Sequence, residues 1–499
     1  MKKETFFSST LLVAALLAAA LFAFTPPPEA QENPAKKPEK PLAMVIPLGK
    51  SREIKIDRTM QGDLRFEEYD ESVIEVTYEG KRKVITVRGI NTGSTDLTVR
   101  SKKGRRLYAI TVMEEAGTLP SGVRVEVTGS TVPREVIREA VTASARLRAE
   151  VRPGARISVA MGKGDTIPAA FEGERLELKL RLSIAGPGYI TVEKELPVTV
   201  ERVAGEYRRD DLLLLSNDPE KISKEAVLLE AAVPLNRAAR LMVHHQNYRE
   251  GGTRIMRVLL SPAGSSPSRV LLVQSLVGPS TDEMYAGHLA ASNFLTRLRA
   301  MQGWIVDIPE GKEYAAVEVP IKPGGTVSGL LYIVPLSGAA LKVVVDAKGG
   351  ENIEIGPDTS SRTRGVFQNP EISIQKTHTV GKGYTFISLG GKPYLREKTT
   401  GSENTGNYGV TYRITVDLEN PYEEENDVEV CFIPGAGPAS GIITVNGSLM
   451  NIPHAVNLQE ISLFKEKLGP LEKKTIELSI FPQAGSNYPV RIVVKSRLI

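Results

Sequence analysis

The sequence predicts a mainly β protein of several domains. Most of the chain after residue 42 reads as short runs that alternate apolar and polar residues, with Gly, Pro and Asn between them, which is the pattern of antiparallel strands joined by turns. A length of 499 residues exceeds what one hydrophobic core usually supports. A helical pattern is convincing in one stretch only. We therefore expect three or four domains, built largely from sheets.

The beginning of the chain predicts export. Lys2 and Lys3 precede an apolar run at residues 11–24, which is shorter than the roughly 20 residues of a membrane span and is typical of a secretory signal. We take residues 1–24 as a signal peptide, with an uncleaved membrane anchor as the alternative. Residues 25–41 are rich in Pro, Lys and Glu and predict an extended, solvated linker. The protein is then expected in the periplasm, in the cell envelope or at the cell surface.

Residues 42–115 predict a small N-terminal β module. Its runs include IEVTYEG, KVITVRG and RLYAITVM, with Gly-containing turns between them. We expect residues 87–99, VRGINTGSTDLTV, to form the centre of a β hairpin. There Gly89 and Gly93 would take positive φ angles at little cost, and Asn91 tolerates the same backbone region.

The same residues resemble the pilus formation protein N-terminal domain. This family begins the secretin-type outer-membrane channels of tight-adherence pili and occurs in related exported proteins. Its pattern is a Gly-Lys-Ser start, an x-V-I-x-V strand and a G-x-x-x-G-x-T-x-L hairpin, matched here by Gly49, Lys50, Ser51, Val73, Ile74, Val76, Gly89, Gly93, Thr95 and Leu97. The resemblance implies a role in envelope assembly or surface scaffolding. It does not imply a channel, because nothing after residue 120 reads as a pore domain.

Residues 116–203 predict a small α+β domain. The stretch TVPREVIREAVTASARLRAEV is helical in pattern and ends before RPGA, and strands such as RLELKLRLSI follow it. Thr131 is the expected N-cap, and Pro133 fits the first turn. The helix is expected to pack against its own domain through an apolar stripe of Val136, Ile137, Ala140 and Val141.

Residues 204–350 and 351–499 predict two related antiparallel β-sandwiches. Residues 254–262, RIMRVLLSP, and 413–421, RITVDLENP, both begin with Arg and end with Pro. A Gly-Pro pair follows at the same spacing in both stretches, beginning at Gly278 and at Gly437, which indicates an internal duplication. The stretch LLLLSNDPE together with ARLMVHHQN also resembles uncharacterised exported bacterial β-rich proteins, a family that lends no function.

Composition and motifs favour a non-catalytic protein. The chain has 63 Lys and Arg against 59 Asp and Glu, and this net charge of +4 gives no reason to expect nucleic acid as a partner. The sequence contains no G-x-S-x-G elbow, H-E-x-x-H pair, P-loop or paired-cysteine metal motif. Cys431 is the only cysteine, so no disulfide can form within one chain. We assign no catalytic, cofactor-binding or metal-binding residue, and no cofactor.

Two polar groups carry weaker hypotheses. His244 and His245 could bind a metal with His288, but consecutive side chains of a strand point to opposite faces. We therefore expect one of the paired histidines to be buried and hydrogen-bonded and the other to be exposed. The acidic residues nearby lack the spacing of a calcium loop, so we expect a solvated linker and an Asn-Asp-Pro turn from the segment with Glu206, Asp210, Asp211, Asp218 and Glu220.

The aromatic residues leave glycan binding open. Trp304, the single tryptophan, is expected in a core or at a sandwich edge. The Gly-rich residues 381–412 are where a binding loop is expected, and they contain Tyr384, Tyr394, Tyr408 and Tyr412.

These observations together predict an exported, non-catalytic envelope or cell-surface protein. It would act in pilus-type or secretion-type assembly, or in surface scaffolding, through protein–protein contacts made by module faces and sheet edges. Its expected partners are envelope or pilus-assembly proteins. A glycan-binding or glycan-processing surface protein is the alternative. No nucleic acid is expected, and the membrane is expected only through an uncleaved signal.

Overall fold

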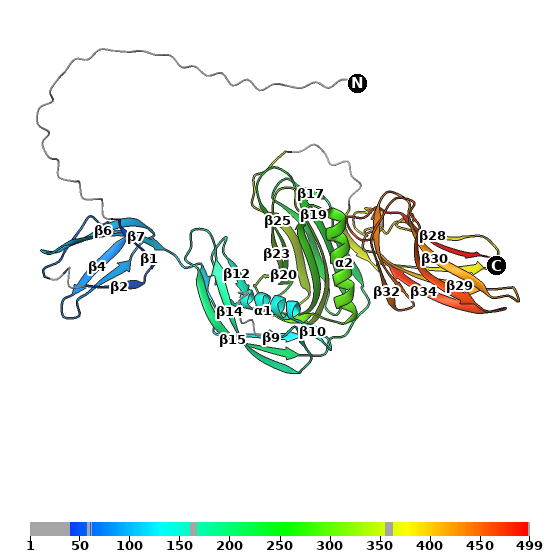
Figure 1. Ribbon diagram of the computed structural model, residues 1–499, viewed down its shortest axis with the longest axis horizontal. Coiled ribbons are helices and arrows are strands. Elements are labelled where there is room, and N and C mark those ends of the chain that lie inside the picture. The colour runs from blue at the N-terminus through cyan, green and yellow to red at the C-terminus, as the bar shows by residue number, and fades with distance from the viewer. Residues whose placement is uncertain (1–39, 57–59, 61, 160–166, 355–362, 498–499) are drawn as a thin grey trace, which may run out of the picture. The chain divides into compact units, whose positions relative to one another are not determined.

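The structure is a computed structural model that describes residues 40–56, 60, 62–159, 167–354 and 363–497. The chain divides into two compact units, Met1–Val112 and Met113–Ile499, and each is described by itself. Figure 1 shows that strands dominate both units, so the prediction of a mainly β, multi-domain fold with β-sandwiches is confirmed. The expected signal peptide and nearly all of the expected linker lie outside the described residues.

The first unit is a small β-sandwich of two sheets. One sheet has the order β1 (Leu42–Pro47), β7 (Arg105–Met113), β6 (Gly93–Arg100), β3 (Arg65–Glu67). The other has the order β2 (Ser51–Lys55), β5 (Val84–Gly89), β4 (Ile74–Glu79). Because alternate side chains of each strand point inward, both sheets contribute to one core, which includes Ile46, Ile85, Val87, Leu97 and Ile110.

The expected hairpin at residues 87–99 is wrong. β5 pairs with β2 and β4, whereas β6 pairs with β7 and β3, so the segment between β5 and β6 connects the two sheets. Neither Gly89 nor Gly93 takes a positive φ angle. Gly89 is required for space instead, because a Cβ there would lie 2.7 Å from Cγ1 of Val112. The pattern of small residues marked a close approach rather than a tight turn.

The second unit contains the predicted helix near its start, after three short strands. α1 (Arg134–Arg148) buries the predicted stripe, including Val136 and Val141, which confirms the helix. The expected cap is wrong, since Pro133 is the N-cap residue and the Thr131 hydroxyl donates to the carboxylate of Glu172 instead. The strands around the helix are β8 (Gly117–Thr118), β9 (Val123–Val127), β10 (Val132–Pro133), β11 (Glu150–Val151), β12 (Arg156–Val159), β13 (Ala170–Phe171), β14 (Arg175–Ala185) and β15 (Val192–Arg202).

A sandwich follows whose larger sheet is continuous with these strands. β9 pairs with β22, so one sheet runs in the order β12-β14-β15-β9-β22-β21-β24-β19-β16-β26, with β17 also on β19. A second sheet, β18-β25-β20-β23, packs on it. The strands are β16 (Leu212–Ser216), β17 (Lys221–Ile222), β18 (Ala226–Val233), β19 (Ala239–Asn247), β20 (Arg254–Pro262), β21 (Ser268–Ser280), β22 (Trp304–Ile308), β23 (Tyr314–Ile321), β24 (Thr326–Gly338), β25 (Leu341–Lys348) and β26 (Arg364–Gln368).

The C-terminal sandwich repeats part of this topology. Its sheets are β27-β29-β34-β31-β32 and β28-β35-β30-β33. The order β33-β30-β35-β28 corresponds to β22-β21-β24-β19 of the preceding sandwich, and the β29–β34 pair corresponds to β20–β23. The strands are β27 (Glu371–Thr379), β28 (Thr385–Leu389), β29 (Thr411–Glu419), β30 (Asn426–Pro434), β31 (Ala439–Val445), β32 (Ser448–Ala455), β33 (Ile461–Leu468), β34 (Lys473–Ile480) and β35 (Val490–Arg497).

A second helix, which the sequence did not predict, joins the two sandwiches. α2 (Glu283–Arg299) packs on β21 and β24 and also contacts β31 and β32 (Figure 1). A Cβ at Gly287 would lie 1.9 Å from the carbonyl oxygen of Ala484, so a glycine is needed for this close approach. The resulting apolar layer includes Met242, Ala291, Phe294, Ile442 and Phe481.

Candidate functional site

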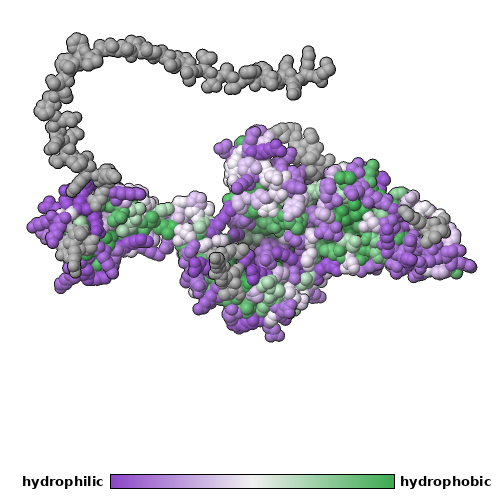
Figure 2. Space-filling model, in the orientation of Figure 1, coloured by the Kyte–Doolittle hydropathy of each residue, from purple (hydrophilic) through white to green (hydrophobic). Residues whose placement is uncertain are grey.

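The N-terminal module has one apolar sheet edge. β1 ends its sheet, and its neighbour among the described residues is β7 alone. The strand reads LAMVIP and carries no charged side chain. Leu42 and Val45 are 53% and 43% exposed, and Leu48 directly after the strand is also exposed. Figure 2 shows hydrophobic surface gathered on part of the visible face of this module, beside hydrophilic surface.

The other edges of the module are protected in the usual ways. β3 is only three residues long and carries Arg65 and Glu67. β2 and β4 carry charged side chains, among them Arg52 and Glu75. Short length and charge both discourage pairing with another strand, whereas a neutral apolar edge invites it. Pro47 at the end of β1 has no N–H to donate, so residues 42–46 of β1 are the part of these edges best suited to accept an additional strand.

Only part of the expected aromatic site is exposed. Trp304 is buried, and its indole N–H donates to the hydroxyl of Tyr314 at 3.1 Å, so it is a core residue. Tyr412 is also buried, and Tyr408 packs edge-on against Tyr488. Tyr394 is only partly exposed.

One exposed aromatic pair remains at the edge of the C-terminal sandwich. Tyr384 is 63% exposed and Phe386 is 56% exposed, and their ring centroids lie 6.0 Å apart. Phe386 belongs to β28, which ends its sheet. Exposed rings of this kind can stack on a sugar or cover an apolar side chain of a partner.

The acidic segment is less solvated than the sequence suggested. Glu206 is exposed, but Asp210 is buried and forms an ion pair with Arg240, whose side chain is equally buried. Glu220 is buried as well. Asp211 pairs with Arg237 at 3.3 Å, and Asp218 lies 3.9 Å from Arg364. The expectation of a solvated linker is therefore wrong at Asp210 and Glu220, because the segment packs between strands of the large sheet and the next sandwich.

Both members of the histidine pair are buried, which corrects the expectation that one is exposed. β19 lies inside the large sheet with both faces covered, so neither face leaves a side chain in water. Nδ1 of His245 lies 2.9 Å from the carbonyl oxygen of Pro219, and Nε2 lies 2.8 Å from the Ser216 hydroxyl. Because a carbonyl oxygen only accepts, Nδ1 carries the proton and neutral Nε2 accepts from Ser216. His245 is thus a structural residue.

The burial of His245 predicts a pH dependence of stability. Burial lowers the pKa of His245 from 6.5 to about 4. The imidazole is neutral in the folded protein, so its contribution to the free energy of unfolding is complete above pH 6.5. This contribution is lost as the pH falls toward 4, because the unfolded chain then binds a proton that the folded chain does not. Between pH 7.5 and pH 4.5 we therefore expect the free energy of unfolding of His245→Gln to fall by about 2–3 kcal/mol less than that of the wild type. Urea denaturation of both proteins at the two pH values measures this, and equal losses would contradict it.

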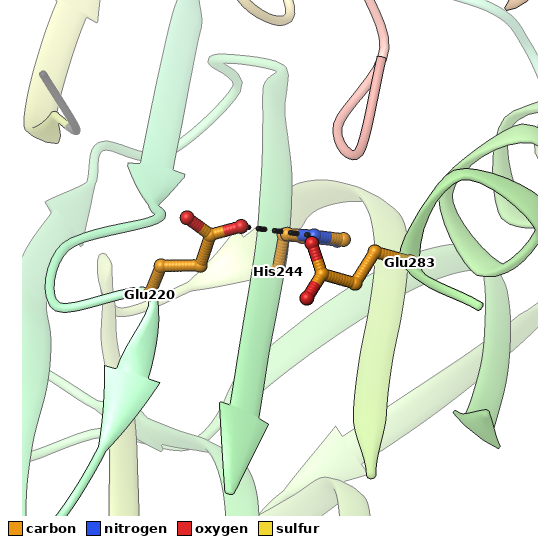
Figure 3. A group of neighbouring side chains, drawn as sticks. All are labelled: Glu220, His244 and Glu283. Atoms are coloured by element: carbon orange, nitrogen blue, oxygen red, sulfur yellow. Dashed lines mark ion pairs between the residues drawn. The ribbon is translucent and has the colours of Figure 1, made fainter. Parts of the chain in front are cut away.

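His244 faces a different group. Its Nε2 lies 3.8 Å from Oε1 of Glu220, and Glu283 from the first turn of α2 approaches from the other side, as Figure 3 shows. One ligand atom from each of the three residues lies within 4.8 Å of the others. His288 does not join them, because its Nδ1 accepts from the side-chain amide of Gln483 at 3.0 Å. The proposed set of His244, His245 and His288 is therefore not brought together.

A basic cleft was not anticipated. A cavity of about 400 Å³ lies between the end of α1, the start of β12 and strands β20 and β23. Arg146 and Arg156 share Glu318 at 3.7 and 3.6 Å, which leaves positive charge in excess at that pair. The small net charge of the whole chain gives no sign of this local excess of basic residues, but the sequence RLRAEVRPGAR does show the arginines close together. The cleft is lined by the basic side chains of Arg146, Arg152, Arg156, Arg257 and Lys348, of which Arg152, Arg257 and Lys348 already pair with Glu114, Asp346 and Glu225.

Comparisons with known proteins add little to these sites. No family model matches the chain, and no curated protein sequence matches it significantly. Mouse clustered PcdhgC3 EC1-3 is 12% identical with a TM-score of 0.12 over 33% of this chain and 66% of that one, just under two thirds of its length. Drosophila N-cadherin EC1-4 is 13% identical with a TM-score of 0.12, over 38% and 56%. The Bacteroides ovatus mixed-linkage glucan utilization locus SGBP-B, in complex with a mixed-linkage heptasaccharide, is 9% identical with a TM-score of 0.14, over 61% and 71%. Values this low support no argument about function.

The described helices also bear on the membrane question. None of them is both long enough and apolar enough to span a bilayer.

Proposed function

We propose that the protein is an exported, non-catalytic envelope or cell-surface protein that acts in pilus-type or secretion-type assembly, or in surface scaffolding, through protein–protein contacts. The observation that carries the proposal is the exposed edge strand β1, which is uncharged and apolar, in a module that forms its own compact unit. The resemblance of this module to the pilus formation N-terminal domain supports the same role.

The mechanism is addition of a strand to β1. The backbone N–H and C=O groups on the open side of β1 would pair with an extended segment of an envelope partner, which supplies affinity without a preformed pocket. Leu42 on one face of β1 and Val45 on the other would cover apolar side chains of that segment and set its register. The larger second unit then presents its sandwiches as a scaffold.

Deleting residues 42–112 tests this function. The second unit keeps its own cores and is expected to remain folded, while recovery of the envelope partners that cross-link to the full chain falls at least tenfold. Circular dichroism of the shortened chain checks that its β structure is intact. If the folded, shortened chain recovers the same partners as the full chain, the assignment of recruitment to this module is wrong.

Glycan binding is a second candidate because of the aromatic pair at Tyr384 and Phe386. It differs in where the ligand binds, since it needs the C-terminal sandwich and not the N-terminal module. A glycan array probed with the full chain and with Tyr384→Ala separates the two functions. Binding to a sugar that is lost in the variant would favour this candidate, and no binding to any glycan would remove it.

A further inference from the structure

We propose that Glu220, His244 and Glu283 form a binding site for a divalent first-row transition-metal ion, with Zn²⁺ as the best fit. The three side chains converge from separate elements, namely the segment before β17, the strand β19 and the first turn of α2 (Figure 3). They offer one imidazole nitrogen and two carboxylate oxygens, each within 4.8 Å of the others. This inference concerns the second unit and is independent of the function proposed for β1.

The spacing is close to what an ion requires. Donor atoms about 2.1 Å from a tetrahedral ion lie about 3.4 Å from one another. Side-chain rotations of Glu220 and Glu283 would bring their oxygens inward to that spacing without moving β19, on which His244 is fixed by the sheet. Glu220 and His244 are buried, whereas Glu283 is only partly buried, so an ion can enter from its side.

Neighbouring residues contact the Glu283 carboxylate and the backbone that carries Glu220. The side-chain amide of Gln246 donates to Oε1 of Glu283 at 2.9 Å, and its backbone N–H donates to the carbonyl oxygen of Glu220 at 2.7 Å. His245 anchors the preceding residue of that segment, since its Nδ1 donates to the carbonyl oxygen of Pro219. Such supporting contacts orient metal ligands and are typical of built sites. His244 is therefore the metal ligand, and His245 fixes the segment that carries Glu220.

A second three-residue cluster has its carboxylates neutralised by a lysine of the protein. Glu429, Cys431 and Glu460 also lie within 4.8 Å of one another. There the ammonium group of Lys495 contacts both carboxylates, so a cation from the protein already balances them. Burial raises the pKa of the Cys431 thiol to about 12, which keeps it protonated and a poor ligand. This cluster serves as an internal comparison that should not bind metal.

The donor set selects the class of ion. Imidazole with carboxylates suits Zn²⁺ and neighbouring transition metals, whereas Mg²⁺ and Ca²⁺ prefer oxygen ligands alone and more of them. Three protein ligands leave a position for water. The bound ion would also tie the N-terminal turn of α2 to the large sheet, at the junction between the sandwiches.

Calorimetry with the metal alone tests the site. The full chain, prepared without a polyhistidine tag, is titrated with ZnCl₂ and separately with MgCl₂. We expect one Zn²⁺ per chain with no comparable binding of Mg²⁺, and a rise in the unfolding temperature when Zn²⁺ is present. Glu283→Gln, at a partly exposed position, is expected to weaken Zn²⁺ binding at least tenfold and to abolish the thermal shift. His244→Gln is expected to weaken it further.

Glu429→Gln is the matched control, because it alters the second three-residue cluster in the same way. It is expected to leave Zn²⁺ binding unchanged. The proposal is overturned if the wild-type chain binds no Zn²⁺ at millimolar concentration, or if Glu283→Gln binds Zn²⁺ as tightly as the wild type. It is also overturned if Glu429→Gln weakens binding as much as Glu283→Gln does.

Discussion

Replacing Val45 by Lys is expected to abolish recruitment of the envelope partner while the N-terminal module stays folded. Val45 lies in the middle of β1 with its side chain exposed, so the change removes no core contact. A lysine on an edge strand opposes pairing, because a partner strand would have to desolvate the charge. We expect at least a tenfold loss of partner recovered by cross-linking from envelope fractions, with the free energy of unfolding changed by less than about 0.5 kcal/mol.

Tyr78→Lys is the control for this prediction. Tyr78 is also exposed, but it lies on β4, at the edge of the other sheet of the same module. The Tyr78→Lys variant adds the same charge to the same module but leaves β1 unchanged. Equal recovery with Val45→Lys and the wild type, or equal loss in both variants, would show that β1 is not the docking edge.

Replacing Arg240 by Ala is expected to lower the stability of the second unit by about 3–5 kcal/mol, because it leaves the buried Asp210 carboxylate without its counter-charge. The side chains of Arg240 and Asp210 are only 6% and 5% exposed. Arg240 also donates to the carbonyl oxygen of Gly409 at 3.1 Å and to the Thr411 hydroxyl at 2.8 Å, so one side chain joins β19 to the C-terminal sandwich. Urea denaturation followed by circular dichroism measures the loss.

Two further variants separate the buried charge from general damage. Arg240→Met combined with Asp210→Asn removes both charges and is expected to cost less than Arg240→Ala alone. Arg237→Ala breaks the nearby pair with Asp211, whose side chains are 47% and 32% exposed, and is expected to cost less than about 1 kcal/mol. If Arg240→Ala costs no more than Arg237→Ala, the buried pair does not stabilise this junction.

The two helices show why one could be predicted and the other could not. α1 buries one face, so its apolar residues recur at helical spacing and the pattern is visible in the sequence. α2 packs against the large sheet on one side and against the C-terminal sandwich on another. Small and apolar residues of α2 therefore occur on more than one of its faces, which blurs the helical periodicity of the sequence. Gly287 even weakens the local helix preference, and its reason is the distant carbonyl of Ala484.

The two candidate sites also differ in how much of each can be predicted from the sequence. The uncharged run of β1 can be read in the sequence, but that it ends a sheet follows only from which strands pair. In the sequence, His244 and Glu220 belong to separate polar groups, and no local pattern connects Glu283 to either of them. The three are neighbours only because α2 returns to β19, a contact between residues far apart in the chain. Local alternation predicted the strands, whereas the long-range pairing that builds the sites left no local signal.

The most direct test of the docking edge is photo-cross-linking in the cells that produce the protein. A photoreactive amino acid is placed at Val45 on β1 and, in a separate variant, at Leu471, a more exposed position in a turn of the C-terminal sandwich. We predict that position 45 cross-links to an extended segment of another envelope protein and that position 471 does not. Cross-links from position 45 that are absent, or that reach only this chain's own residues, would contradict the account.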